Sequence, residues 1–307
     1  MTIHIPVLKR EAIEALGIEP GGAYVDATLG GGGHAFEIIS KMKGRGNLLV
    51  IDSSLEAIEN FKKTLISEGF KSNSSRYFKK DLNVYLENDN FANFKNIVSK
   101  YSLNRINGIL ADLGLSTDQI YAIPGISYMK EGDLDMRLDK SLQVKASDLL
   151  NGLYKKELER LFKELADVEF AKELSKEIIS WRANKLFSTT KDLIDLIQKV
   201  VPKEVRKGTR KNPEAKVFQA LRIAVNNELG SLRSFLPQAL EALSPGGKIV
   251  IISFHSGEDR IVKKFIRDHQ DNIQIAEEER LVRASLSEIN NNPRSSSAKM
   301  RVFSKKI

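Results

Sequence analysis

The pattern of apolar and polar residues predicts alternating strands and helices in the first part of the chain. Residues 23–28 form a short apolar run rich in strand-forming residues, and apolar side chains follow at near-helical spacing over 36–42. A second apolar run at 47–52 ends in Asp52 and leads into a further helical pattern. This β-α-β-α order is typical of a parallel sheet covered by helices.

The same pattern predicts a helical domain inserted into the sheet. Buried strands are expected at 106–116 and 248–254, whereas a crossover between parallel strands needs only about a dozen residues. Apolar residues at three- and four-residue spacing predict helices between them, at 145–165, 169–187, 189–201 and 217–243. We therefore expect a sheet domain of residues 1–112 and 217–307, with an insertion at 113–216.

Four consecutive glycines follow the first predicted strand, in the stretch "DATLGGGGHA" at 26–35. A glycine loop that opens a helix brings backbone N–H groups close to a ligand, and an acid ending the next strand, Asp52, can accept hydrogen bonds from ribose hydroxyls. Gly30, Gly32 and Ala35 fit the dinucleotide fingerprint, although that pattern has frequent false matches. The loop predicts a site for a nucleoside-containing cofactor; a tight turn without a ligand is the alternative.

Asp26 distinguishes between nucleotide cofactors, because it ends the first predicted strand four residues before the first glycine. A carboxylate there would repel a pyrophosphate but can approach a cationic amino-acid moiety. The position therefore favours S-adenosylmethionine over a nicotinamide dinucleotide.

Composition narrows the chemistry further. The 307 residues include no cysteine, which excludes disulfides, cysteine-bound clusters and thiolate nucleophiles. A methyl transfer that needs a thiolate nucleophile or a cysteine-bound cluster is therefore excluded, which leaves a heteroatom as the acceptor if the chain transfers a methyl group. The start of the sequence lacks a signal-peptide pattern and no long apolar run occurs, which predicts a cytoplasmic protein without a membrane partner.

The basic charge suits a polyanionic partner. The formal net charge is +8, and two segments concentrate basic residues: the tail at 293–307, and a group comprising Lys203, Arg206, Lys207, Arg210, Lys211 and Lys216. Solvated loops and phosphate binding explain such runs equally well.

Seven segments, in order along the chain, resemble the bacterial 16S rRNA (cytosine-N4)-methyltransferase family. They are "HIPVL", "DATLGGGGH", "DLGLSTDQI", "GISYMKEGDLDMRLD", "FQALRIAVNNEL", "PGGKIVIISFHSGEDRIVK" and "NPRSSSAKMR". The family commonly reads S-S-P-Q-L-D where this chain has "STDQIY" and F-H-S-L-E-D where it has "FHSGED". These departures concern the substrate pocket, whereas the donor loop is intact.

The resemblance implies an α/β fold of the class I S-adenosylmethionine-dependent methyltransferases, a Rossmann-like doubly wound sheet with an inserted helical substrate-recognition domain. It implies S-adenosylmethionine as methyl donor and, as acceptor, a cytidine in the decoding region of 16S rRNA, within the small ribosomal subunit. It leaves the oligomeric state open, a homodimer included. Matched motif by motif, the cofactor contacts fall on Gly32, Gly33, His34, Asp52, Leu82, Asp112 and Gln119.

Asp112 is the candidate catalytic residue. It lies near the C-terminal end of the predicted strand at 106–116, where open α/β sheets bind ligands, and it can accept a hydrogen bond from the exocyclic amine of cytosine. Methyl transfer from a sulfonium needs no metal. Three alternatives stay open: a methyltransferase acting on another RNA, a nicotinamide oxidoreductase using the same glycine loop, and a metal-dependent nuclease built on Asp112, Asp133, Asp135 and Asp139.

Other polar residues have structural explanations beside functional ones. We expect His34 to cap its helix and shape the donor pocket, and Ser256 with Asp259 to form a capping box after His255. Arg137 lies among Asp133, Asp135 and Asp139, which favours internal ion pairing over a metal site. Gln219, Arg222 and Asn226 form a polar stripe that is either solvated or in contact with RNA.

Overall fold

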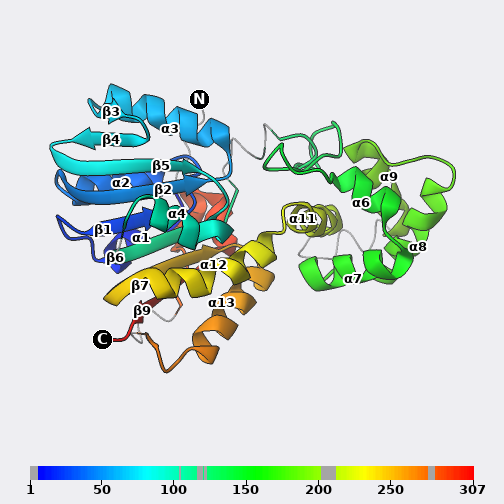
Figure 1. Ribbon diagram of the computed structural model, residues 1–307. Coiled ribbons are helices and arrows are strands. Elements are labelled where there is room, and N and C mark those ends of the chain that lie inside the picture. Colours follow the sequence, from blue (N-terminus) through cyan, green and yellow to red (C-terminus); the bar gives the residue numbers. More distant parts are fainter. Residues whose placement is uncertain (1–5, 104, 116–119, 121–122, 202–211, 276–280) are drawn as a thin grey trace. The chain divides into compact units, whose positions relative to one another are not determined.

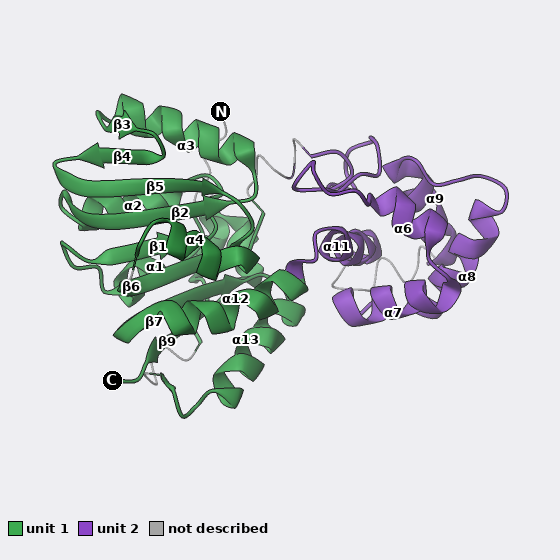
Figure 2. Cartoon of the chain, in the orientation of Figure 1, with its two compact units in different colours: residues 1–116, 229–307 green, residues 117–228 purple. Residues whose placement is uncertain are grey.

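The computed structural model describes residues 6–103, 105–115, 120, 123–201, 212–275 and 281–307. The chain divides into two compact units. Unit 1 comprises residues 1–116 and 229–307, and unit 2 comprises residues 117–228 (Figure 2). Within the described ranges, no helix is both long and apolar enough to cross a membrane.

A single sheet runs through unit 1 (Figure 1). Among the described residues it has nine strands, in the order β3-β4-β5-β2-β1-β6-β7-β9-β8. The five strands from β5 to β7 in that order are parallel, and β3, β4, β9 and β8 pair antiparallel with their neighbours. The bounds are β1 (Ala23–Asp26), β2 (Arg45–Asp52), β3 (Lys71–Asn73), β4 (Arg76–Lys79), β5 (Asp81–Asn88), β6 (Ile106–Asp112), β7 (Leu243–Ser253), β8 (Ile273–Gln274) and β9 (Lys299–Lys305).

Helices cover both faces of this sheet. On one face lie α1 (Lys9–Leu16), α2 (Gly33–Lys41) and α3 (Leu55–Ser67), and on the other α4 (Phe94–Lys100), α12 (Glu228–Ala242) and α13 (Ser256–Asp268). Side chains of β2 alternate between the two cores: Leu48 and Val50 pack with the first set of helices, Leu49 and Ile51 with the second. Short elements complete the unit, namely η1 (Phe91–Asn93), α14 (Leu286–Asn291) and η3 (Pro293–Ser297).

Unit 2 is helical, as its apolar spacing predicts. It contains α6 (Ala146–Gly152), α7 (Lys155–Ala166), α8 (Ala171–Arg182), α9 (Thr190–Val200) and α11 (Pro213–Val225). Its core is separate from the sheet and includes Leu150, Phe162, Leu174 and Leu221, all fully buried.

The second domain boundary falls later than the expected residue 216. The apolar side of α11, including Val217 and Leu221, packs in the core of unit 2, where the helix contacts α6, α7 and α9. Unit 2 therefore extends to Glu228. The stretch 217–243, expected as one helix, is broken at Asn227, which adopts a left-handed conformation with φ of 47° between α11 and α12. Asparagine tolerates this conformation better than most residues.

Candidate active site

Three aspartates end neighbouring parallel strands of unit 1. Asp26 ends β1, Asp52 ends β2 and Asp112 ends β6, and the sheet order β2-β1-β6 places them at one edge. Crevices outside the carboxyl ends of parallel strands are where open α/β sheets bind ligands. The glycine loop follows β1 at this same edge.

Asp52 holds the glycine loop in shape. Its Oδ2 accepts the N–H of Gly30 at 2.9 Å, and its Oδ1 accepts the N–H of Ser54, the N-cap of α3, at 2.7 Å. Burial raises the pKa of Asp52, and these two hydrogen bonds oppose the rise. Each oxygen retains a further lone pair, so the carboxylate can still accept a hydrogen bond from a ligand.

The glycines at the loop–helix junction are explained by contacts within the chain. A Cβ on Gly33 would lie 2.1 Å from Cγ of Pro6, and one on Gly32 would lie 2.7 Å from the ring of Phe61. Gly32 also has a φ of 79°, in the region that favours glycine. At these two positions the close neighbour is thus the protein itself.

Two carboxylate oxygens at this edge are buried and have no hydrogen-bond partner among the described residues, Asp26 Oδ2 and Asp112 Oδ1. Burial raises the pKa of Asp26 well above its usual value, and the charges of Asp112 and Asp52 add to the rise. A buried carboxylate without a partner is costly unless a ligand compensates it. The ammonium and ribose hydroxyls of S-adenosylmethionine are such hydrogen-bond donors, so the residues present fit this cofactor.

His34 connects Asp112 to the segment before α1. Its Nε2 lies 3.1 Å from the carbonyl oxygen of Val7, and its Nδ1 lies 3.7 Å from Oδ2 of Asp112. The expected capping function is not observed, because the N-cap of α2 is Gly32 and no side chain caps it. His34 instead packs against the carboxylate from within the first turn of the helix.

Asp112 has an unusual protonation equilibrium. Burial raises its pKa to about 7, and the charge of Glu258 adds to the rise. The N–H of Gly114 and the charge of Arg294 oppose it. A carboxyl group that titrates near neutral pH is well matched to proton transfer.

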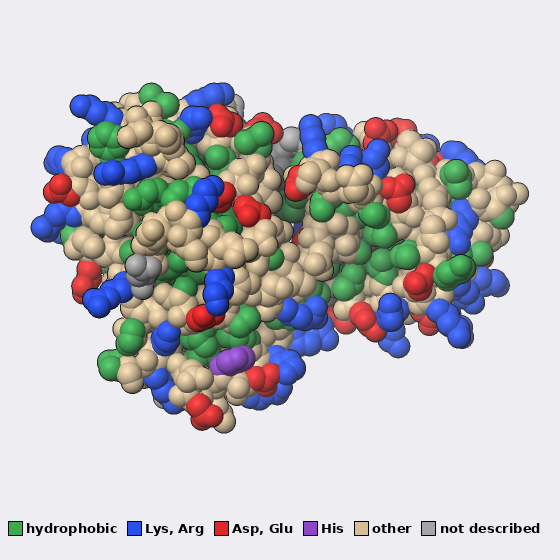
Figure 3. All heavy atoms as spheres, viewed as in Figure 1, with side chains coloured by type: hydrophobic (Ala, Val, Ile, Leu, Met, Phe, Trp, Pro, Cys, Tyr) green, Lys and Arg blue, Asp and Glu red, His purple; other side chains and the backbone are tan. Residues whose placement is uncertain are grey.

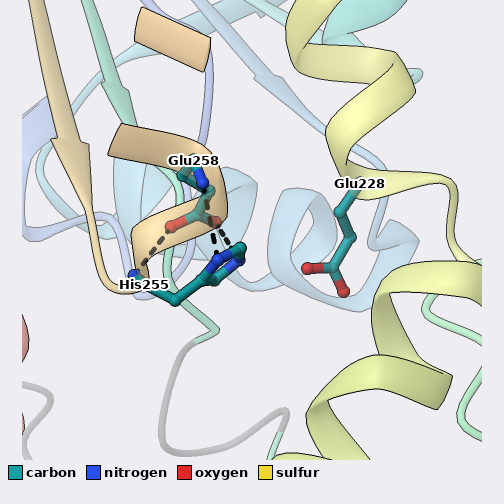
Figure 4. A group of neighbouring side chains, drawn as sticks. All are labelled: Glu228, His255 and Glu258. Carbon is teal, nitrogen blue, oxygen red and sulfur yellow. Dashed lines mark hydrogen bonds and ion pairs between the residues drawn. The ribbon is translucent and has the colours of Figure 1, made fainter. Parts of the chain in front are cut away.

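The capping box of α13 lies one residue earlier than expected. His255 is the N-cap, and its Nδ1 accepts the N–H groups of Gly257 and Glu258, at 3.2 and 3.4 Å. Glu258 Oε2 reciprocates by accepting the N–H of His255, while Oε1 lies 3.2 Å from His255 Nε2 (Figure 4). Ser256 is therefore the first helical residue, and Asp259 pairs instead with Lys299 and Arg301. Glu228, also drawn in Figure 4, is the last residue of unit 2.

One of the expected cofactor residues lies away from this edge, and a second cannot be located within the described part of the chain. Leu82 lies near the amino end of β5, paired with Gly46 and buried in the core, whereas the glycine loop lies at the carboxyl ends of the strands. Gln119 lies outside the described residues. Phe91, which the sequence analysis did not single out, begins η1 just beyond the carboxyl end of β5. It is partly buried, and its ring packs edge-on against Phe235 of α12. The sequence does contain a signal for this position, because apolar and polar residues alternate over 81–88 and an aromatic residue, Phe91, follows shortly after.

The acidic loop of unit 2 is internally paired. Arg137 donates to both carboxylate oxygens of Asp135, at 2.6 and 2.9 Å, and lowers the pKa of that carboxyl group. Asp139 accepts the N–H and the hydroxyl of Ser141. The polar stripe of α11 is also used within the unit: Arg222 pairs with Glu228, and Asn226 bonds the backbone of Met136 and Leu138.

Three of the five basic residues of the tail lie in strand β9 of the sheet. Lys299 and Arg301 of β9 pair with Asp259, and Lys305 donates to the carbonyl groups of Glu241 and Leu243. Arg294 donates to the carbonyl of Leu115.

The second basic group, which comprises Lys203, Arg206, Lys207, Arg210, Lys211 and Lys216, is described only at Lys216. The side chain of Lys216 donates to the carbonyl of Asp167, and the other members lie at 202–211, outside the described residues. On the face shown in Figure 3, basic side chains are interleaved with acidic ones.

The sheet order, the three strand-end acids and the glycine loop define a class I S-adenosylmethionine-dependent methyltransferase. The chain belongs to the MraW methylase family, whose model matches residues 1–306. This membership decides against the nicotinamide oxidoreductase and nuclease alternatives.

Curated relatives cover nearly the whole chain. The protein is 38% identical to the ribosomal RNA small subunit methyltransferase H of Mycoplasmopsis pulmonis, over 99% of this chain and 100% of the relative. It is 37% identical to the protein of the same name from Clostridioides difficile, over 98% of each chain. Among solved structures, an rRNA methylase from Streptococcus thermophilus aligns over 100% of both chains with 11% identity and a TM-score of 0.46.

Proposed function

We propose that the protein transfers a methyl group from S-adenosylmethionine to the exocyclic N4 of a cytidine in the decoding region of 16S rRNA, within the small ribosomal subunit and hence in the cytoplasm. The relatives named as ribosomal RNA small subunit methyltransferases support the substrate class. The observation that carries the chemistry is Asp112, a strand-end carboxylate with one buried oxygen that has no partner among the described residues.

The donor fits the edge formed by the glycine loop and the three aspartates. Asp52 faces the loop through Gly30 and is the acceptor for ribose hydroxyls, while the fully buried Asp26 is the counter-charge for the donor's ammonium. The glycine loop leads into α2 at Gly32, Gly33 and His34, and we assign these residues to the wall of the donor pocket. Phe91, beyond the end of β5, is the aromatic surface that can take the adenine. The bound donor supplies an activated methyl carbon and a good leaving group.

Asp112 acts on the acceptor. The lone pair of the cytosine amine is delocalised into the ring, which makes the nitrogen a weak nucleophile. The nitrogen must therefore be oriented toward the methyl carbon and must donate a hydrogen bond to a proton acceptor. The ionised carboxylate of Asp112 accepts a hydrogen bond from N4. The N4–carbon bond forms as the bond from that carbon to the sulfonium sulfur breaks, with S-adenosylhomocysteine as the leaving group. N4 then carries a positive charge and gives up one proton, which Asp112 takes up. The target base has to leave its stack to reach this edge.

A labelled-methyl assay on small-subunit RNA, with nucleoside mass spectrometry of the product, tests the proposal. The wild-type protein should produce N4-methylcytidine, and Asp112→Asn should lower the single-turnover rate by roughly 10²-fold or more, as for loss of an acid–base partner. Asp195→Asn, which changes an exposed carboxylate of unit 2, is the matched control and should keep the full rate. A rate for Asp112→Asn within a few-fold of wild type would show that Asp112 only holds the donor.

A further inference from the structure

The segment that follows Asp112 is held by contacts from three sides. The N–H of Leu113 donates to the carbonyl of Ile252 in β7 at 2.9 Å. The ring of Phe254 packs so closely on Gly114 that an added Cβ would lie 2.6 Å from a ring carbon. The third contact is the side chain of Arg294, which donates to the carbonyl of Leu115. The contacts made by Ile252 and Phe254 involve no charged group, so among these three contacts only that of Arg294 carries a charge.

Arg294 is itself anchored by a rigid element. It lies in η3, next to Ser295, whose side chain is almost completely buried and whose N–H and hydroxyl both donate to the carbonyl of Asn292. Two residues after η3, Lys299 begins β9 and pairs with Ser253 of β7. The backbone that follows η3 is therefore tied to β7, which pairs with β6, the strand that ends in Asp112.

The charged and titratable groups around Asp112 are mostly unfavourable for its ionisation. Asp26 of β1 and Glu258 of α13 are acidic, and His34 of α2 approaches Oδ2 at 3.7 Å. Arg294 is the one group that stays cationic at all relevant pH values among the described residues that shift Asp112, and it opposes the effects of burial and of Glu258.

We propose that Arg294 is a positioning residue for methyl transfer, which through its hydrogen bond to the carbonyl of Leu115 holds the segment after β6 and with it the carboxylate of Asp112. This inference rests on the proposed function of Asp112 as the acceptor of the N4 proton. It makes the C-terminal part of the chain a component of the catalytic apparatus, in which Arg294 acts through the segment that carries Asp112 rather than on the donor or the acceptor.

The experiment compares Arg294→Met, which removes the charge, with Arg294→Lys, which keeps it without the guanidinium fork. The pH dependence of kcat/KM is measured for methylation of small-subunit RNA. Arg294→Met should move the acidic limb upward by about one pH unit, the size expected for loss of a nearby opposite charge. Arg294→Lys should leave the midpoint close to that of wild type. Arg267→Met, an exposed arginine of α13, is the matched control and should have the wild-type profile.

Two readouts do not depend on catalysis. Hydrogen exchange of the amides at 113–115 should become faster in Arg294→Met, and the affinity for S-adenosylmethionine, measured by calorimetry at pH 9, should stay within about threefold of wild type in all variants. An unchanged midpoint in Arg294→Met, or unchanged exchange at 113–115, would overturn the proposal. If Arg294→Met does not fold, Arg294→Gln, which also removes the charge, takes its place with the same expected shift of the midpoint and the same faster exchange at 113–115.

Failure of the proposed function gives a different result. In that case the wild-type protein does not methylate the RNA, whereas the faster exchange at 113–115 is still observed in Arg294→Met.

Discussion

The burial of Asp112 suits the function proposed for this residue but lowers the stability of the folded protein at pH values where the carboxyl group is ionised. Its pKa of about 7 in the folded protein lies well above the ordinary aspartate value of 3.8, so the folded state binds the proton more tightly than the unfolded state. The stability associated with this group is fully present below pH 4 and is lost as the pH rises through about 7. The carboxylate is thus kept at a site where ionisation is unfavourable, which is consistent with a proton acceptor rather than a structural acid.

Asp112→Asn should therefore stabilise the protein at high pH while abolishing most activity. The free energy of unfolding at pH 8 should rise by up to about 4 kcal/mol, the upper limit set by a shift of about three pH units. The gain should disappear near pH 4, where the wild-type carboxyl is protonated in both states. Denaturant titrations at the two pH values measure this difference, and an equal gain at both would show that ionisation is not its cause.

The same residue should govern the pH dependence of catalysis. Because the ionised form accepts the proton, kcat/KM should rise with pH and level off above an apparent pKa near 7. The residual activity of Asp112→Asn should lack this limb. A wild-type profile that is flat between pH 5 and 9 would contradict the function given to Asp112.

Asp52 is the second residue whose proposed function can be measured. Asp52→Ala should weaken the binding of S-adenosylmethionine by about 1.5–3 kcal/mol, since it removes charge-assisted hydrogen bonds to ribose and also releases Gly30 from its tether. Calorimetry gives the affinity, with the exposed Asp268→Ala as control. An unchanged affinity would remove Asp52 from the donor site.

At the scale of elements, the sequence predicts best where local pattern and local chemistry agree. The segment from β1 to β2 was predictable because an apolar strand, a glycine loop and a strand-end acid follow one another within 30 residues. Strand β5 was missed, although its burial alternates regularly, because its exposed face is polar and no motif accompanies it. Leu82 was accordingly matched to the amino end of a strand whose carboxyl end leads to Phe91.

Long-range packing explains the other differences between expectation and structure. The sequence predicts that the basic residues of the tail are solvated or bind phosphate. In the structure, β9 lies between β7 and β8, and this brings Lys299 and Arg301 to Asp259. The partners lie about 40 residues apart in sequence, so no local pattern reveals them. The same holds for α11, whose apolar side could pack against either unit and packs in unit 2.

The assignment of α11 to unit 2 has an energetic consequence. Leu221→Ala creates a cavity in the core of unit 2 and should cost about 2–5 kcal/mol in the stability of that unit. Affinity for S-adenosylmethionine should be unchanged, because the described parts of the proposed donor site, the glycine loop and the three strand-end aspartates, all lie in unit 1. Differential scanning calorimetry and donor titration measure the two quantities, with Leu186→Ala at an exposed position as control. Loss of donor affinity in parallel with stability would contradict the division.

For the whole molecule, the net charge of +8 is the property most directly related to an RNA partner. Most of the basic tail is engaged within unit 1, which leaves the group at 203–211 as the main candidate for phosphate contacts. Neutralising Lys207, Arg210 and Lys211 together should weaken RNA binding and reduce its salt dependence, without changing donor affinity. A triple variant at Lys63, Lys71 and Lys263 has the same net charge and serves as control. Equal salt slopes in the two triple variants would exclude a specific contact.

Mass spectrometry of 16S rRNA nucleosides from a strain that lacks this protein is the most direct measurement of its function. We expect the deletion to remove N4-methylation from one cytidine of the decoding region, the wild-type gene to restore it, and the gene for Asp112→Asn to leave it absent. N4-methylcytidine at an unchanged level in the deletion strain would contradict the proposed reaction.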